Sequence, residues 1–236
     1  MLGTTPEEKA NIAPFLTFLG LIMLGQLVGK PFEGRQVFWA LQEPGYWVNP
    51  AQALICGAMV LRWRRFYDFS APKQPLLALL AGLAAIAVWL APQFLPWQLP
   101  EFLQSKGRYS GFDPYFFGSS GPAFWLNISL RFLKLVVVVP IIEEIFWRNF
   151  LLRWMIDQDF TRVPFGTFTW TSFLVVTAGF TIEHQMADYP AAVITAVLYN
   201  LIAIRTKSLT SCILAHAATN LLLGAYVLYT GQWGFW

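Results

Sequence analysis

Long apolar runs are the feature that most constrains how this chain can fold. A helix that crosses a lipid bilayer needs roughly 20 consecutive, mostly apolar residues, and the sequence supplies several such runs, for example PLLALLAGLAAIAVWLAPQFL at 75–95. Short segments that hold most of the lysines, arginines and prolines separate them. Of the 236 residues, 56% are hydrophobic and 12% are charged, which is typical of membrane proteins. The runs therefore predict an all-α fold, a polytopic bundle of membrane helices.

We expect about seven transmembrane helices, one for each apolar run. Their ranges are 13–29, 46–63, 75–95, 123–146, 168–185, 189–204 and 209–229. The segment at 96–122 is too polar and too rich in glycine and proline to span lipid, so we expect a surface loop with an interfacial aromatic stretch. The first run has no basic segment before it and no small-residue cleavage site after it, which favours a retained anchor over a secretory signal.

Basic residues in two loops indicate how the helices are oriented. They are Arg62, Arg64, Arg65 and Lys73 after the second expected span, and Arg205 and Lys207 before the last one. Because cytoplasmic loops carry an excess of lysine and arginine, both loops are expected to face the cytoplasm, with the N-terminus inside and the C-terminus outside. Arg131 and Lys134 run against this orientation, since they lie near the end of the fourth span that it puts outside.

Charge and cysteine usage argue against two classes of function. The net charge is +3, and the basic residues are scattered among loops without forming a groove-like stripe, so nucleic acid is not expected as a partner. Cys56 and Cys212 lie inside apolar helices and far apart in the sequence. A cysteine in that setting behaves as a small buried hydrophobe, and the spacing supports neither a redox pair nor a metal site.

Three charges interrupt the fourth apolar run, in the sequence IIEEIFWRNF at 141–150. A charged side chain at the bilayer centre costs on the order of 2.5–3.5 kcal/mol even on the lenient insertion scale. A span that ended near Ile142 would leave these charges at the headgroups, but the apolar sequence continues after them. At 3.6 residues per turn, Glu144 and Arg148 form an i, i+4 pair on one face and can neutralise each other. Glu143 is turned away from Glu144 by about 100° and has no cation of its own.

A proline adds irregularity beside these carboxylates. Pro140 lies three residues before Glu143. Because proline has no N–H, it frees a carbonyl near Val136 and tends to kink a spanning helix. We therefore expect an irregular helix next to the charges.

The only two histidines of the chain both lie in the apolar helices that follow these charges. His184 comes four residues after Phe180, and Asn220 comes four residues after His216, so each pair shares one helix face. A single histidine in an apolar helix is usually a hydrogen-bonded core residue. Two histidines with an asparagine and Glu143 instead form a pattern that marks functional sites in membranes. We expect the fourth, fifth and seventh spans to bring these groups together.

This set of side chains suits hydrolysis of a peptide bond. A carboxylate and an imidazole, Glu143 and His184, can together hold and deprotonate a water molecule that attacks a carbonyl carbon. A second imidazole and a carboxamide, His216 and Asn220, can stabilise the negative charge that develops on the carbonyl oxygen. The sequence thus predicts cleavage of a peptide bond inside or at the edge of the membrane.

Two other chemistries compete with this one. Two histidines and one glutamate could form a catalytic zinc site with three protein ligands, but the HExxH spacing is absent, and Glu183 and His184 point about 100° apart on a helix. A serine mechanism is the second alternative, because GSSG at 118–121 matches the GxSG pattern of rhomboid intramembrane proteases. Ser120 follows a polar stretch rich in glycine and proline, however, which favours a loop.

Three motifs follow one another along the chain. They are EExxxR at Glu143, Glu144 and Arg148, FxxxH at Phe180 and His184, and HxxxN at His216 and Asn220. In order and spacing they resemble the CPBP family, the CAAX prenyl protease and bacteriocin-processing group of glutamate-dependent intramembrane endopeptidases, also called the ABI family. The resemblance implies a catalytic helical core at about 122–229, variable N-terminal membrane helices and the polar loop at 1–121, and an interfacial C-terminal tail at 230–236. The continuation FWRNFLLRW is similar to a bacterial branch found beside exosortase protein-sorting systems.

The resemblance also implies a role for each motif residue. The position of Glu143 activates water with help from His184, while His216 and Asn220 form the oxyanion site. No metal ligand or other cofactor is required by that scheme. The implied supporting residues are Glu144, Arg148 and Phe180.

The implied substrate is a membrane-anchored, lipidated or CAAX-like protein or peptide, and the implied setting is the lipid bilayer of a bacterial inner (cytoplasmic) membrane, crossed several times. A non-proteolytic scaffold or an immunity protein with the same fold is the alternative. The intact motif set favours the enzyme, since a binding module has no need for all four catalytic groups. A proton-coupled transporter is a third alternative, but the chain lacks a visible internal repeat.

One expectation about height in the membrane does not fit the rest. Seven residues at 1.5 Å each place His216 roughly 10 Å from the cytoplasmic end of its helix. His184 comes late in the fifth expected span and therefore nearer the outer face. If the two histidines share a site, the expected spans must be tilted, broken or shifted.

Overall fold

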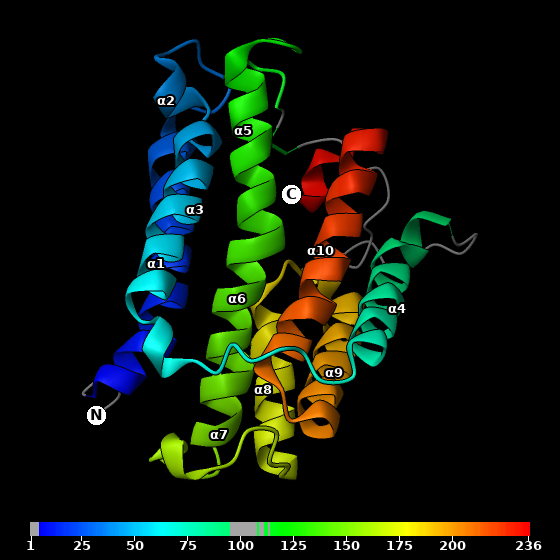
Figure 1. The fold of residues 1–236 in the computed structure, drawn as a ribbon. Coiled ribbons are helices and arrows are strands. Elements are labelled where there is room, and N and C mark those ends of the chain that lie inside the picture. The colour runs from blue at the N-terminus through cyan, green and yellow to red at the C-terminus, as the bar shows by residue number, and fades with distance from the viewer. Residues whose placement is uncertain (1–4, 95–107, 109–110, 113) are drawn as a thin grey trace.

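The computed structural model describes residues 5–94, 108, 111–112 and 114–236. Within these ranges the chain folds into helices joined by turns and irregular segments, without a strand (Figure 1). Five helical segments are long and apolar enough to cross a membrane: Pro6–Phe32, Pro75–Phe94, Pro122–Trp154, Met186–Thr206 and Leu209–Thr230. The predicted all-α membrane bundle is therefore confirmed, whereas the expected number of seven spans is not.

Two antiparallel helices form the N-terminal part of the bundle (Figure 1). They are α1 (Pro6–Gly29) and α3 (Gly45–Arg62), with the short helix α2 (Trp39–Gln42) between them. Helix α1 begins before the expected residue 13 because Thr5 caps it. The Thr5 hydroxyl accepts from the Glu8 N–H at 3.1 Å, and the Glu8 carboxylate accepts from the Thr5 N–H at 3.2 Å. Helix α3 coincides with the expected span at 46–63 but is not among the five spanning candidates.

Helix α4 (Pro75–Phe94) matches the third expected span. Most of the surface loop expected at 96–122 lies outside the described residues. Its described part at 114–121 forms turns that lead into the next helix. Ser120 is exposed in these turns, which agrees with the loop interpretation of GSSG.

One long, irregular helix runs through the centre of the bundle. It consists of α5 (Pro122–Phe132), a π-helical segment (Leu133–Val138), α6 (Val139–Glu144), a second π-helical segment (Ile145–Leu151) and α7 (Leu152–Trp154). The Val139 N–H pairs with the Lys134 carbonyl, five residues back, which defines the π register. The irregularity expected beside Pro140 is thus present. The expected end of this span at 146 is wrong, because the helix continues to Trp154.

Helix α8 (Trp170–Glu183) is shorter than the span expected at 168–185. Its 14 residues rise about 21 Å, less than the roughly 30 Å of a bilayer core. A short turn at Met186–Asp188 leads into α9 (Tyr189–Thr206), and Figure 1 shows both helices in the lower part of the bundle beside α6 and α7. The expected fifth span at 168–185 is therefore not confirmed at its full length. His184, the residue that ends α8, and His216 both lie near the Phe180 ring, so the two histidines meet despite the expected difference in height.

Helix α10 (Leu209–Thr230) follows α9 after a tight turn in which Lys207 adopts a left-handed conformation (φ 51°). The predicted spans at 189–204 and 209–229 are thereby confirmed. In Figure 1 the N-terminus and the α9–α10 turn lie toward the lower end of the bundle, and the C-terminus lies in its upper half.

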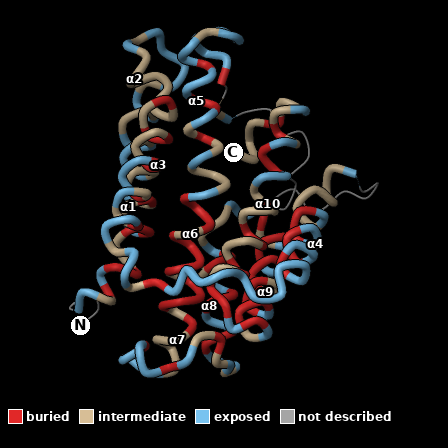
Figure 2. Tube along the Cα trace, viewed as in Figure 1, coloured by how far each residue is buried: buried red, intermediate tan, exposed pale blue. Residues whose placement is uncertain are grey.

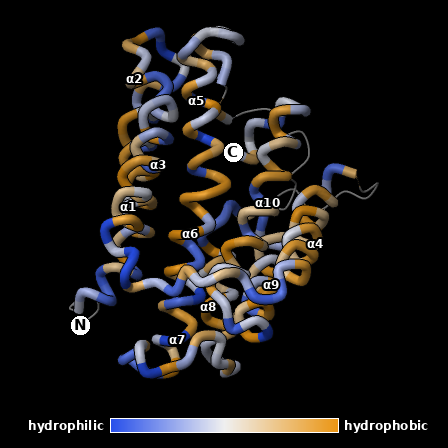
Figure 3. The backbone as a smooth tube through the Cα atoms, viewed as in Figure 1, coloured by the Kyte–Doolittle hydropathy of each residue, from blue (hydrophilic) through white to orange (hydrophobic). Residues whose placement is uncertain are grey.

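Burial is concentrated where α6, α8, α9 and the adjoining part of α10 meet (Figure 2). Large apolar side chains cover the outside of the bundle instead. Leu76, Leu80 and Leu83 of α4, for example, are 70%, 53% and 50% exposed, and Figure 3 shows how hydrophobic this helix is. An apolar exterior around a buried polar centre is the pattern expected for a protein whose ionisable groups face the bundle interior.

Candidate active site

A buried ion pair lies at the centre of the candidate site. Glu144 is the last residue of α6, Arg148 follows in the second π-helical segment, and both side chains are fully buried. Arg148 Nη1 donates to Glu144 Oε1 at 3.0 Å, which confirms the pairing predicted from the i, i+4 spacing. Arg148 Nε also donates to Asn200 Oδ1 of α9 at 3.2 Å. Because buried charges are stable only when paired and hydrogen-bonded, these contacts join the central helix to α9.

His216 of α10 meets the same carboxylate. Its Nδ1 lies 2.9 Å from Glu144 Oε1, although the two residues are 72 positions apart. An ionised carboxylate only accepts hydrogen bonds, so Nδ1 carries the proton in this contact and Nε2 is left for other partners. Glu144 therefore orients one imidazole while it pairs with Arg148.

His184 is oriented by the backbone of its own helix. It is the residue that ends α8, and its Nδ1 lies 2.7 Å from the Phe180 carbonyl oxygen. Since a carbonyl only accepts hydrogen bonds, Nδ1 is the protonated nitrogen, and Nε2 has the lone pair in the neutral ring. This orientation presents Nε2 as an acceptor, which is the form that a proton-accepting group needs.

The Phe180 ring lies beside both histidines. Its centroid is 4.7 Å from that of His184 and 6.5 Å from that of His216. The Arg148 guanidinium lies over the face of the same ring, 4.9 Å from its centroid. Tyr199 of α9 packs against His216 at 5.2 Å. The three motifs therefore meet around one aromatic side chain.

Glu143 has one oxygen without a partner. It is 6% exposed, and within the described residues no group donates a hydrogen bond to its Oε2. Its carboxylate interacts electrostatically with Glu183, Glu144 and Arg148. Glu183, which the sequence suggested only as a metal ligand, accepts a hydrogen bond from Trp147 Nε1 at 3.1 Å. A buried carboxylate oxygen without a hydrogen-bond donor, such as Glu143 Oε2, can take a proton from a water molecule.

Asn220 contacts the irregular part of the central helix, one turn after His216. Its Nδ2 donates to the Leu135 carbonyl at 2.9 Å. In the π register residue 140 would donate to this carbonyl, but Pro140 has no N–H. The free carbonyl therefore lies at Leu135, next to the expected position at Val136. A carboxamide has two N–H donors, and this contact uses one of them.

Several polar residues of the site belong to no motif. Asn200 Nδ2 donates to Thr177 Oγ1 at 3.2 Å, and the Tyr199 hydroxyl donates to Thr219 Oγ1 at 2.7 Å. No sequence pattern singles them out, because single polar side chains are common in membrane helices, where they hydrogen-bond to a neighbouring helix. The position of Thr177 offered one signal. It precedes Phe180 by three residues, which places it on the motif face of α8.

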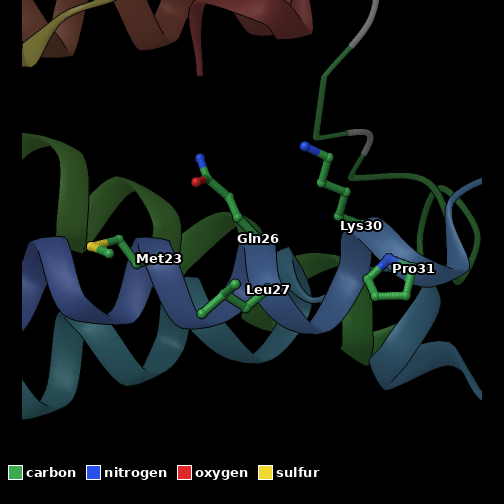
Figure 4. Close-up of a pocket in the computed structure, with 5 residues that line it drawn as sticks. All are labelled: Met23, Gln26, Leu27, Lys30 and Pro31. Atoms are coloured by element: carbon green, nitrogen blue, oxygen red, sulfur yellow. The ribbon is translucent and has the colours of Figure 1, made fainter.

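Two cavities among the described residues lie away from the predicted catalytic residues. A cavity of about 420 Å³ lies against the end of α1, lined by Met23, Gln26, Leu27, Lys30 and Pro31. Figure 4 shows that Gln26 and Lys30 extend to the same side of this helix. The other cavity, of about 300 Å³, lies among the polar residues around Asn149 and Arg153.

The fold and this buried cluster define the class of the protein as an integral, multi-pass helical membrane protein with a polar site inside the bundle. Residues 125–222 match a family model described as Type II CAAX prenyl endopeptidase Rce1-like. The match includes every motif residue from Glu143 to Asn220. The resemblance to the CPBP family is therefore confirmed, and it supports the role of a membrane protease. No curated protein and no solved structure matches the chain.

Proposed function

We propose that this protein is an intramembrane endopeptidase that uses Glu143 to activate water. The observation that carries the proposal is the buried Glu143 carboxylate, whose Oε2 has no partner among the described residues. Two imidazoles support it: His184 and His216 are each held through Nδ1, which leaves Nε2 for another partner, and His216 contacts Glu144, the neighbour of Glu143 in the sequence. A general base, a second water-binding group and donors for an oxyanion are the three parts that hydrolysis of an amide needs.

The proposed proton transfers use these groups. Glu143 and His184 Nε2 hold a water molecule, and Glu143 takes one of its protons as the oxygen attacks the peptide carbonyl carbon. The carbonyl oxygen becomes negative and accepts hydrogen bonds from the second N–H of Asn220 and from His216 Nε2 when that ring is doubly protonated. The C–N bond then breaks, and Glu143 passes its proton to the leaving nitrogen. The products are a carboxylic acid and an amine.

The proposed substrate is a membrane-anchored protein or peptide, lipidated or of CAAX type. The description of the matching family, a CAAX prenyl endopeptidase, supports this choice. We propose that residues 122–229 form the catalytic core and that the helices before it line the path of the substrate. The tail at 230–236 is proposed to lie at the membrane interface. Residence in a bacterial inner membrane, beside an exosortase system, is part of the same proposal.

The test compares cells that carry the wild-type protein with cells that carry Glu143→Gln at equal abundance. Terminal-peptide mass spectrometry of membrane proteins should show fragments that appear only with the wild type. Glu33→Gln serves as the matched control, since Glu33 is an exposed glutamate outside the candidate site and should leave the fragments unchanged. Identical profiles for wild type and Glu143→Gln would contradict hydrolysis and favour a scaffold or immunity protein with the same fold.

A further inference from the structure

A second buried charge lies on the central helix, away from the candidate active site. Arg131, in the last turn of α5, is 4% exposed. Its guanidinium carbon lies 4.5 Å from the centroid of the Phe112 ring and 4.7 Å from that of Trp236. In the part of the chain that the structure describes, no carboxylate forms an ion pair with Arg131, and none of its five N–H groups donates a hydrogen bond.

Lys134 adds a second positive charge at this place. Its ammonium donates to Asn49 Oδ1 at 2.6 Å and to Gln52 Oε1 at 3.2 Å, both on α3. These acceptors are neutral amides, so they satisfy hydrogen bonds but leave the charge uncompensated. Arg131 and Lys134 also interact electrostatically with each other. We refer to these two residues as the cationic pair.

Burial of two like charges next to each other is costly unless an anion joins them. The sequence had placed both residues against the orientation set by the cytoplasmic loops. The structure shows that they lie inside the bundle, on a membrane-spanning helix, and not in a loop. A bound anion would account for this placement, and the planar arginine fork fits a carboxylate.

The cationic pair is connected to the candidate active site along α10. Asn220 contacts Leu135, and Gly224, one turn later, faces the next part of the central helix. A Cβ at Gly224 would lie 3.1 Å from both Leu135 Cδ2 and the Phe132 ring, so a larger residue there would require these side chains to shift. From Leu135 back to Arg131 is four residues, or about 6 Å along the helix axis.

This separation suits a short peptide. Three extended residues span about 10 Å. A scissile carbonyl bound at Asn220 would thus put a carboxylate two to three residues further on within reach of the cationic pair.

We propose that Arg131 and Lys134 bind the C-terminal carboxylate of the substrate and so fix how many residues the enzyme removes. The proposal rests on the proposed peptidase function, since it deepens the description of the same substrate path. Phe112 and Trp236 flank the guanidinium and exclude water from the ion pair. A substrate with a blocked end would lose this contact.

The test measures binding, so that it does not depend on turnover. Calorimetric titration of the detergent-solubilised protein, carrying Glu143→Gln to prevent cleavage, compares an acetylated apolar tripeptide that ends in a carboxylate with the same tripeptide as a carboxamide. We expect the acid to bind at least about tenfold more tightly, because hydrogen bonds to charged groups are the strong ones. Arg131→Gln should remove this preference, and Lys134→Met should reduce it.

Three further variants serve as controls. Arg35→Gln changes an exposed arginine near the end of α1 and should leave the preference intact. Asp113→Asn tests the acidic residue next to Phe112, which lies outside the described residues, and should not abolish the preference. Arg131→Lys keeps the charge and should retain part of the preference even if Arg131→Gln fails to fold.

Equal binding of acid and amide to the parent protein would overturn the proposal, as would an undiminished preference in folded Arg131→Gln. Loss of a copurified anionic lipid from that variant, with tripeptide binding unchanged, would assign the cationic pair to a lipid phosphate and also overturn it. Failure of the peptidase function gives a different result. In that case the cells show no fragments that depend on Glu143, whatever the tripeptides do.

Discussion

Two buried arginines on the same long helix have opposite surroundings. Arg148 is paired with Glu144 and hydrogen-bonded to Asn200, so its charge is compensated inside the bundle. Arg131 has aromatic rings on both sides and, in the described structure, neither a carboxylate nor a hydrogen-bond acceptor. The difference indicates that the Arg148 charge stabilises the fold, whereas the Arg131 charge is available to bind an external anion. A buried charge that the fold does not neutralise is therefore the more informative one for binding.

The largest effect is expected at Glu143, whose carboxylate forms no ion pair in the described structure, whereas that of Glu144 is paired with Arg148; one oxygen of each carboxylate has no hydrogen-bond partner there. Glu143→Gln retains the volume but removes the base, so peptide cleavage should fall by about 10²–10⁴-fold, the contribution usual for general acid–base catalysis. Cleavage is measured with purified protein on a fluorogenic membrane-anchored peptide. The midpoint of thermal unfolding should stay close to that of the wild type, and a variant that cleaves at the wild-type rate would contradict the mechanism.

Glu144→Gln should disrupt the buried ion pair between Glu144 and Arg148. It leaves Arg148 as an uncompensated buried charge, which costs about 3–5 kcal/mol of stability, and it removes the acceptor that orients His216. Thermal unfolding in detergent checks the first effect, and a cleavage assay checks the second. The double variant Glu144→Gln/Arg148→Met should recover part of the lost stability, and an unchanged unfolding midpoint in the single variant would show that the pair is not structural.

The comparison between the two arginines can be tested with one substitution made twice. Arg148→Met should lower the free energy of unfolding by about 3–5 kcal/mol, because it leaves the buried Glu144 carboxylate without its cation. Arg131→Met should change it by less than about 1 kcal/mol, because the loss of the ring contacts is offset by the removal of a buried charge. Denaturant titration followed by tryptophan fluorescence measures both. Equal losses would mean that Arg131 is also compensated within the protein.

Asn220→Ala should give a smaller effect, divided between activity and stability. Loss of one oxyanion donor lowers cleavage by about 10²–10³-fold. The Leu135 carbonyl, which Pro140 leaves without a backbone donor, would lose its partner, and this costs about 1–3 kcal/mol. Asn220→Asp keeps the shape but has no N–H to donate, so it should lose activity in the same way. Full activity in either variant would remove Asn220 from the oxyanion site.

Much of the fold could be predicted because local apolar composition is enough to identify membrane helices. The spans at 75–95, 189–204 and 209–229 match the helices closely, since each is one apolar run between clear polar boundaries. The fifth span was overestimated, because apolar composition at 168–185 does not reveal that α8 starts at Trp170 and turns at His184. Length in the membrane depends on where the turn forms, and that is decided by packing inside the bundle.

The candidate site was predictable in its members and less so in its contacts. The i, i+4 spacing was enough to pair Glu144 with Arg148, because both lie on one helix. It gave no information about His216, which reaches Glu144 from 72 residues away, or about Asn220, which reaches Leu135 from 85 residues away. Contacts between helices depend on their packing angles and registers, and a single sequence does not specify these.

By itself, the sequence determined that this chain is a helical membrane protein whose costly charges gather near three motifs, because desolvation makes every ionisable group in an apolar run conspicuous. Only the tertiary structure decided which of those charges are neutralised. It brings Glu144 between Arg148 and His216, leaves an oxygen of Glu143 open, and buries Arg131 without a described counter-ion. The physical reason is that electrostatic compensation is a matter of a few ångströms between helices, whereas apolar runs are a property of each helix alone.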